Sequence, residues 1–129
     1  MADAMQFDLV SPERRLASLT AREVQIPGSD GDMTAMPGHV PTITTLRPGI
    51  LRVVHTGGAE EFVVSGGFAE VTATSVSVLA EQAVPRAQLS PEFHARMVEE
   101  AQTAVAAAQG SPRADELTKT LADVQALRA

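Results

Sequence analysis

The three histidines are the side chains of this chain best suited to acid–base chemistry or metal binding. His39, His55 and His94 lie far apart in the sequence, with no His-x-x-x-His or carboxylate–histidine spacing among them. The chain has no cysteine, which removes thiolate ligands and disulfides as well. The spacing therefore predicts no catalytic or metal-binding histidine. For His39, which lies between Pro37 and Pro41, it favours a role in loop packing or in an interface.

The sequence also lacks the motifs of a nucleophilic catalyst or of a phosphate-binding loop. Ser65, Ser75 and Ser77 lack the Gly-x-Ser-x-Gly context of a nucleophile elbow. The glycine pairs 57–58 and 66–67 do not precede a helical pattern, and no Gly-Lys-Ser or Gly-Lys-Thr follows them. We interpret them as hairpin and bulge glycines, and we expect the protein not to be an enzyme and to need no cofactor.

The overall composition narrows the class of partner. The 129 residues carry a formal net charge of −6, which disfavours nucleic-acid binding because phosphate contacts need clustered lysine and arginine. The short acidic start, Met1–Met5, does not resemble a secretion signal, and no apolar run approaches the ~20 residues of a membrane span. We therefore expect a soluble protein whose only membrane contact is made through a partner.

The first two thirds of the chain have the apolar alternation of β-strands. Ile50–Val54 and Glu61–Val64 flank the turn signal Thr56–Gly58, and Ser75–Leu79 alternates between polar and apolar residues. Short strands at this spacing are typical of an antiparallel sandwich or barrel.

The period changes to that of helices near residue 85. Ser90–Glu92 predicts a helix start, with a capping serine, a proline at the first position and an acid in the first turn. Gly110 is expected to end this helix, and Ser111–Pro112 to open a second in the same way. The two helices must run antiparallel. Their apolar stripes are rich in alanine, which buries much less area than leucine (about 1.5–3 kcal/mol per buried leucine), so we expect the hairpin to be held modestly.

Four segments in order resemble the epsilon subunit of F-type ATP synthase. The most specific segment lies within residues 31–49, where prolines and glycines recur at fixed intervals. The matching residues are Gly31-Asp32, Pro37-Gly38-His39, Pro41, Thr44, Leu46 and Pro48-Gly49, together with the segments Phe7–Glu13, Glu61–Val71 and Val78–Glu81.

This resemblance implies a fold and a function. The fold is mostly β, with an antiparallel β-sandwich of about ten strands over residues 1–85 and an antiparallel two-helix hairpin over residues 86–129. The function is that of a non-catalytic rotor subunit, which couples the gamma subunit to the c-ring during proton-driven ATP synthesis. Such a subunit is a peripheral part of F1 on the cytoplasmic face of the bacterial inner membrane. Its hairpin can extend toward the catalytic alpha and beta subunits, where it slows ATP hydrolysis.

The resemblance also assigns residues to partners. Asp32 takes the place of the acidic residue that meets the c-ring loop, although aspartate beside glycine is also common as a solvated turn residue. His39 takes the place of the histidine on the gamma-facing surface. Pro37, Gly38 and Pro41 shape that loop.

Thr34 stands where the family usually has glycine, so we expect the turn of that loop to differ locally. The hairpin departs further from the family pattern, because Leu89–His94 lacks the aspartate and arginine of ATP-binding members and the second helix offers only the bases Arg113, Lys119 and Arg128. We therefore predict weak or no ATP binding and weak inhibition. The alternatives are an ATP-sensing regulator whose hairpin gates hydrolysis, and an unrelated β-sandwich adaptor with a helical tail.

Overall fold

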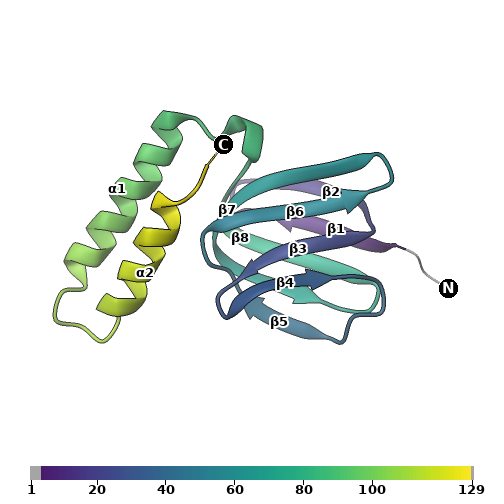
Figure 1. Ribbon diagram of the computed structural model, residues 1–129, viewed down its shortest axis with the longest axis horizontal. Helices are drawn as coiled ribbons and strands as arrows, with labels where there is room; N and C mark the ends of the chain where they lie inside the picture. Colours follow the sequence, from purple (N-terminus) through teal and green to yellow (C-terminus); the bar gives the residue numbers. More distant parts are fainter. Residues whose placement is uncertain (1–3, 129) are drawn as a thin grey trace.

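The computed structural model describes residues 4–128 and contains a β-sandwich followed by two helices (Figure 1). The strands are β1 (Met5–Val10), β2 (Arg15–Ala21), β3 (Glu23–Gly28), β4 (Gly31–Ala35), β5 (Thr42–Thr45), β6 (Gly49–His55), β7 (Gly58–Val71) and β8 (Ser75–Pro85). A 3-10 helix, η1 (Arg86–Gln88), leads to α1 (Pro91–Ala107) and α2 (Ala114–Gln125). The predicted fold class, a β-sandwich with a C-terminal helical hairpin, is confirmed.

The predicted division of the chain falls at the end of the last strand. β8 ends at Pro85 and η1 follows at once, so the proposed boundary between residues 85 and 86 coincides with a change of secondary structure. The first three residues and Ala129, which the predicted domains include, lie outside the described residues.

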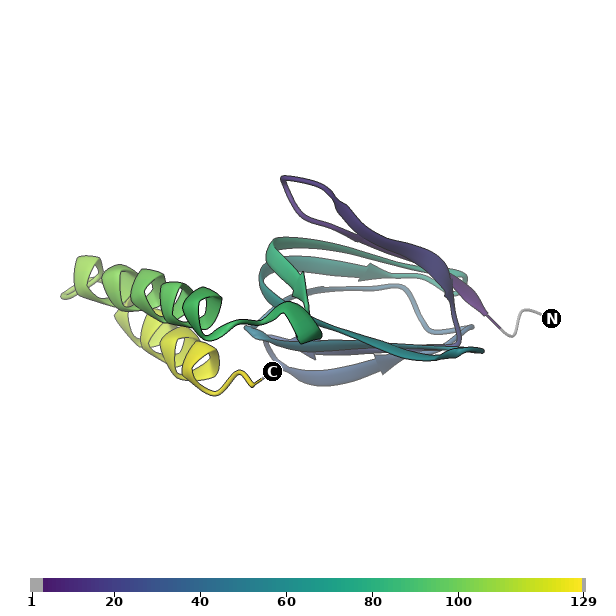
Figure 2. The same cartoon turned by 90° about the horizontal axis from the view of Figure 1, so that it is seen from above.

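One continuous eight-stranded sheet folds over into two layers to form the sandwich. Its order is β2-β1-β8-β7-β6-β3-β4, and β5 joins it by pairing with β7. Figure 2 shows the sandwich from above, with the helical hairpin beyond one of its ends. Neighbouring strands in the described part of the chain pair antiparallel, apart from β1 and β8, which pair in parallel over residues 6–10 and 75–79.

The sandwich has eight strands where about ten were expected, because two long strands serve both layers. The first half of β7 pairs with β6 and its last four residues pair with β5, while β8 follows β7 along almost its whole length. The strand pair bends at Gly66 and Gly67, whose φ values are 73° and 92°.

The bend at Gly66 and Gly67 is not the bulge that we predicted. Ser65 faces Gln82 and Gly67 faces Ala80, so the register is unbroken and no extra residue is inserted. Glycine is required here for close approach, because a Cβ on Gly67 would lie 1.8 Å from the carbonyl oxygen of Leu79. The turn between β6 and β7 matches the prediction, since His55 faces Gly58 across a two-residue hairpin loop.

The core between the layers consists of the apolar residues that alternate with outward-facing polar ones. Strands from both layers contribute side chains that are almost fully buried: Phe7, Leu9, Val24, Ile26, Leu51, Val53, Val64, Val71 and Val76. Phe7 is the largest of the fully buried side chains, and Phe62, which is 4% exposed, is a second aromatic residue in an otherwise non-aromatic core cluster.

The two helices begin in different ways. The Ser90 hydroxyl accepts a hydrogen bond from the Phe93 N–H at 3.0 Å and Pro91 is the first helical residue, as predicted. The prediction for the second helix was wrong. α2 begins at Ala114, because Ser111 instead accepts from the Arg113 N–H at 3.1 Å and forms a turn before the helix. The hairpin therefore has one capped helix and one uncapped helix.

The hairpin packs on an apolar row of the sandwich that we call the covered row: Ile50, Val63 and Val84, which lie opposite one another on β6, β7 and β8. These side chains point away from the main core. They join a second cluster with buried residues of the C-terminal part: Met97 of α1, Val124 of α2, and Leu89 and Leu127, which flank the two helices. His94 Nε2 lies 2.7 Å from the Val124 carbonyl oxygen and so donates a hydrogen bond from α1 to the last turn of α2.

Candidate interaction surfaces

Asp32 lies on the edge strand β4 and forms an ion pair with Arg47. The Asp32 side chain is 77% exposed, whereas that of Arg47 is only 28% exposed. Arg47 belongs to the short segment between β5 and β6, and its main-chain N–H donates to the Pro27 carbonyl at 3.0 Å. The acid predicted to meet a partner is therefore exposed, with a better-anchored cation beside it.

The end of the sandwich that carries Asp32 is tied together by hydrogen bonds between two loops. The Ser29 N–H donates to the Thr45 carbonyl at 2.9 Å, and the Thr45 hydroxyl donates to Ser29 Oγ at 2.7 Å. Gly28 is buried there, and a Cβ on it would come within 2.7 Å of the Gly31 carbonyl oxygen. These contacts fix the position of the β3–β4 turn, and with it the start of β4.

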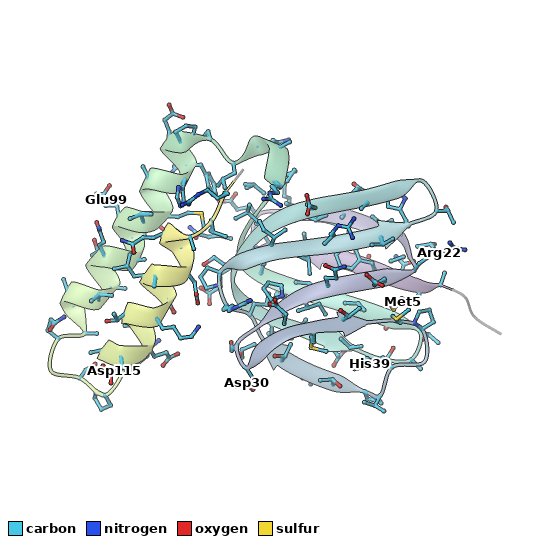
Figure 3. The ribbon with its side chains drawn as sticks, viewed as in Figure 1. Met5, Arg22, Asp30, His39, Glu99 and Asp115 are labelled. Atoms are coloured by element: carbon cyan, nitrogen blue, oxygen red, sulfur yellow. The ribbon has the colours of Figure 1, made fainter. Side chains whose placement is uncertain are left out.

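His39 lies in the loop between β4 and β5, away from Asp32. Figure 3 labels His39 and Asp30, the near neighbour of Asp32, toward opposite ends of the sandwich. The His39 N–H donates to the Met36 carbonyl at 3.0 Å, and Gly38, with φ of 87°, closes this turn between Pro37 and Pro41. His39 Nδ1 lies 2.7 Å from the Val40 carbonyl oxygen and donates to it. The structure thus separates the two predicted contact residues.

An exposed apolar surface, which we call the bare row, lies on the outside of the other layer. Val10, Leu79 and Phe68 face one another directly across β1, β8 and β7. Leu79 and Phe68 are 44% and 42% exposed, and Ile43 on β5 is 68% exposed. A hollow of ≈ 560 Å³ lies over this surface, rimmed by Asp8, Arg15 and Glu70.

The sequence reasoning missed the bare row, although a signal for it was present. Phe68-Ala69 and Val78-Leu79 are adjacent apolar residues within strands β7 and β8. Because successive side chains of a strand point to opposite faces, such a pair places one apolar residue in the core and the other outside. Ala69 and Val78 are buried, and Phe68 and Leu79 are the outward members.

Two polar clefts lie between the hairpin and the sandwich. The first, of ≈ 470 Å³, has Arg14 and Arg96 on its walls against Glu13, Glu81 and Glu100. The second, of ≈ 440 Å³, lies between α2 and the Arg47 loop and contains equal numbers of acids and bases, namely Arg47, Arg113, Lys119, Glu81, Glu116 and Asp123. Neither cleft has an excess of positive charge.

The histidines remain on separate elements, on the β4–β5 loop, at the end of β6 and on α1. In residues 4–128 no group of three His, Cys, Asp or Glu side chains is arranged to hold a metal ion. Neither helix within this range has the length and apolarity that crossing a membrane requires.

A sequence model of the family "ATP synthase, Delta/Epsilon chain, beta-sandwich domain" matches residues 4–86. Curated relatives include ATP synthase epsilon chains of Rhodobacter capsulatus, 58% identical over 98% of this chain and 96% of the relative, and of Fuscovulum blasticum, 55% identical over 100% and 97%. The epsilon chain of Paracoccus denitrificans is 52% identical over 98% and 90%.

Solved structures agree with these relatives. A chain in the Euglena gracilis mitochondrial ATP synthase, in its OSCP/F1/c-ring part, superposes with a TM-score of 0.69 at 27% identity, over 97% of this chain and 78% of that one. A chain in the central stalk and c-ring of the Tetrahymena thermophila enzyme superposes with a TM-score of 0.57 at 16% identity, over 68% and 71%. The second match supports the fold alone.

Proposed function

The chain belongs to the ATP synthase epsilon-chain family, the non-catalytic subunits of the F1 central stalk, and we propose that it couples the gamma subunit to the c-ring during proton-driven ATP synthesis. The observation that carries this proposal is the bare row, an apolar surface on the outside of a sandwich whose other apolar surface is already covered. Exposed apolar surfaces with a polar rim are typical of protein–protein contact sites.

The gamma subunit is the proposed partner of the bare row. Phe68, Leu79 and Ile43 supply an aromatic and two aliphatic anchors, and the hollow beside them can accept side chains from a partner. The loop of His39 extends the surface with the exposed residues Met36 and Val40. This supports the assignment of His39 to the gamma-facing side, with Pro37, Gly38 and Pro41 shaping its loop.

The c-ring is the proposed partner of the opposite end, where Asp32 lies. An exposed carboxylate at the rim of an interface contributes chiefly to orientation and to the rate of association. The hydrogen bonds between the two loops at this end suit it to carrying load. Gamma is thus proposed to bind the bare row and the His39 loop, and the c-ring to bind the Asp32 end of the same continuous sheet. Rotation of one partner is then transmitted to the other without chemistry in this subunit.

The hairpin is proposed to inhibit hydrolysis weakly and to bind ATP weakly or not at all. The first cleft has two arginines against three glutamates, so it lacks the excess of positive charge that favours a nucleoside triphosphate. His94, in the segment where ATP-binding members carry their motif, is engaged with the Val124 carbonyl. These features disfavour the alternative of an ATP-sensing regulator. As part of F1, the subunit is proposed to lie at the cytoplasmic face of the bacterial inner membrane, with membrane contact through the c-ring only.

Binding to purified gamma subunit tests the proposal. We expect tight one-to-one binding, weakened about tenfold or more by Leu79→Asp because the charge would be buried in an apolar contact. Thr34→Asp, an exposed position on β4, is the matched control and should bind as the original chain does. His39→Ala should weaken binding and Asp32→Ala should not. An original chain that does not bind gamma would favour the adaptor alternative.

A further inference from the structure

We propose that Arg47 is a positioning residue, which holds the Asp32 carboxylate in the orientation that a cation on the partner requires. The inference rests on the proposed function, because it concerns the end of the sandwich assigned to the c-ring. Arg47 donates to Asp32 Oδ1 through Nη2. The second carboxylate oxygen, Oδ2, is then the one left to accept from a positively charged side chain outside the molecule.

The main chain around Arg47 is held on both sides. The Arg47 N–H donates to the Pro27 carbonyl, and the Leu46 N–H donates to the Gly67 carbonyl, each at 3.0 Å. Leu46 and Pro48, its two neighbours, are buried. Because the main chain of Arg47 is fixed, its guanidinium group can hold the Asp32 side chain in one orientation. Without Arg47, the exposed side chain of Asp32 would rotate freely on the edge strand.

The guanidinium group itself is also confined. Its Nη1 is buried, with no hydrogen-bond partner among the described residues. This nitrogen lies 3.7 Å from the point where a Cβ on Gly49 would be, and the Cβ of Pro27 lies 2.7 Å from the same point. The buried position of Nη1 restricts how far the guanidinium group can turn, and Nη2 faces Asp32.

The other charges in the neighbourhood leave Arg47 to Asp32. Across the second cleft, Asp123 is paired with Lys119 at 3.1 Å within α2, and Glu116 is paired at 3.9 Å with Arg113, which directly precedes α2. The remaining acid of the cleft, Glu81, lies against Gly66 on the strand pair β7–β8. The acids of the hairpin therefore have their own cations, and the Arg47–Asp32 pair belongs to the sandwich alone.

Stabilising the fold is a poor explanation for this pair. One of its members is largely exposed, and exposed ion pairs contribute little to the free energy of unfolding. The geometric effect is larger, since charges at the rim of an interface act by fixing register and approach. The pair therefore supplies orientation, and the recognised chemistry is an arginine or lysine side chain on a polar loop of the c-ring.

A double-mutant cycle tests the inference. F1 assembled with each variant is bound to F1-depleted membranes that retain the c-ring, and the dissociation constant is measured at low and high salt. We expect Asp32→Asn to weaken binding about two- to fivefold at low salt. Arg47→Gln should weaken it equally, the double variant should be no worse than either, and Arg47→Lys should restore most of the affinity. Arg52→Gln, which removes an exposed arginine on β6, is the control and should have no effect.

The outcomes separate this inference from the proposed function. Additive losses, or an Arg47→Gln variant that binds normally while Asp32→Asn is weakened, would overturn the positioning role and leave the Asp32 contact standing. An Asp32→Asn variant that binds normally would overturn both the contact and the positioning role. Thermal unfolding of each variant, with no change expected for Arg47→Gln beyond that of an exposed pair, excludes a general loss of structure.

Discussion

The covered row and the bare row are both apolar surfaces on the outside of the sandwich, but only the covered row is buried by the hairpin. Both run across β7 and β8 and point away from the core, and each places apolar side chains directly opposite one another. In the covered row, Val63 is 1% exposed beneath Met97 and Val124 of the hairpin. In the bare row, Leu79 is 44% exposed with no part of the described chain over it. One surface is covered within the chain, and the other is left exposed and is the proposed contact surface for gamma.

The difference between the two rows depends on the bend at Gly66 and Gly67. The bend lets a single pair of strands belong to both layers, so that outward residues on one side of the bend face the hairpin and outward residues on the other side face away from it. The hairpin is attached through η1 immediately after β8 and reaches only the first of these surfaces. A single pair of strands can therefore offer one apolar surface to the hairpin and another to a partner protein, without a second domain.

The largest expected effect comes from removing the bend. Gly67→Ala would place a Cβ 1.8 Å from the Leu79 carbonyl oxygen at a φ of 92°. We expect a loss of roughly 3 kcal/mol or more in the free energy of unfolding, because main-chain atoms must move. Thermal or urea unfolding followed by circular dichroism measures it.

A matched control separates close approach from positive φ. Gly110, with φ of 81°, has no atom within 4 Å of its would-be Cβ. Gly110→Ala should therefore cost only the strain of the left-handed conformation, about 1 kcal/mol. Equal losses for the two variants would show that the contact with β8 is unimportant.

The next effect contrasts the two rows directly. Val63→Ala removes buried methyl groups and should lower the free energy of unfolding by about 1–3 kcal/mol. Leu79→Ala removes more apolar atoms from an exposed site and should change it by less than about 1 kcal/mol. The same two variants should rank in the opposite order when binding to gamma is measured by calorimetry. A single order in both assays would contradict the distinction between the rows.

Much of this architecture could be predicted from the sequence because it rests on local signals. The glycine turn at residues 56–58 and the capped start of α1 at Ser90 follow from backbone preferences that act within a few residues. Val124 and Leu127, the last apolar residues at helical spacing in the sequence, are both buried.

What could not be predicted depends on tertiary contacts. Ser111–Pro112 repeats the signal of Ser90–Pro91, yet Ser111 caps a turn in place of the helix. The ion pair of Asp32 joins positions 15 residues apart across two loops, and no spacing rule reports such a contact. The parallel pairing of β1 with β8 likewise joins the two ends of the sandwich sequence.

The two Ser-Pro signals give a smaller effect with a built-in control. Ser90→Ala removes the hydroxyl that accepts from the Phe93 N–H, and we expect it to cost about 1 kcal/mol. Ser111→Ala removes only a turn contact and should cost a few tenths of that. Hydrogen exchange of the α1 amides should rise for the first variant alone. Identical exchange in the two variants would mean that neither serine helps to hold the hairpin that packs on the covered row.

The smallest effect concerns the tie between the sandwich and the end of the hairpin. Arg86 donates from Nε to the Arg128 carbonyl at 3.1 Å and from Nη1 to Glu61 Oε2 at 3.3 Å. Because these contacts are partly exposed, Arg86→Gln should lower global stability by less than about 1 kcal/mol. Local opening is more sensitive, since α2 is uncapped and its last turn depends on the sandwich. We therefore expect faster proteolysis of α2, with β-sheet amides unchanged. Faster exchange throughout the sheet would mean that the sandwich and the hairpin open as one cooperative unit. The hairpin could then not detach by itself.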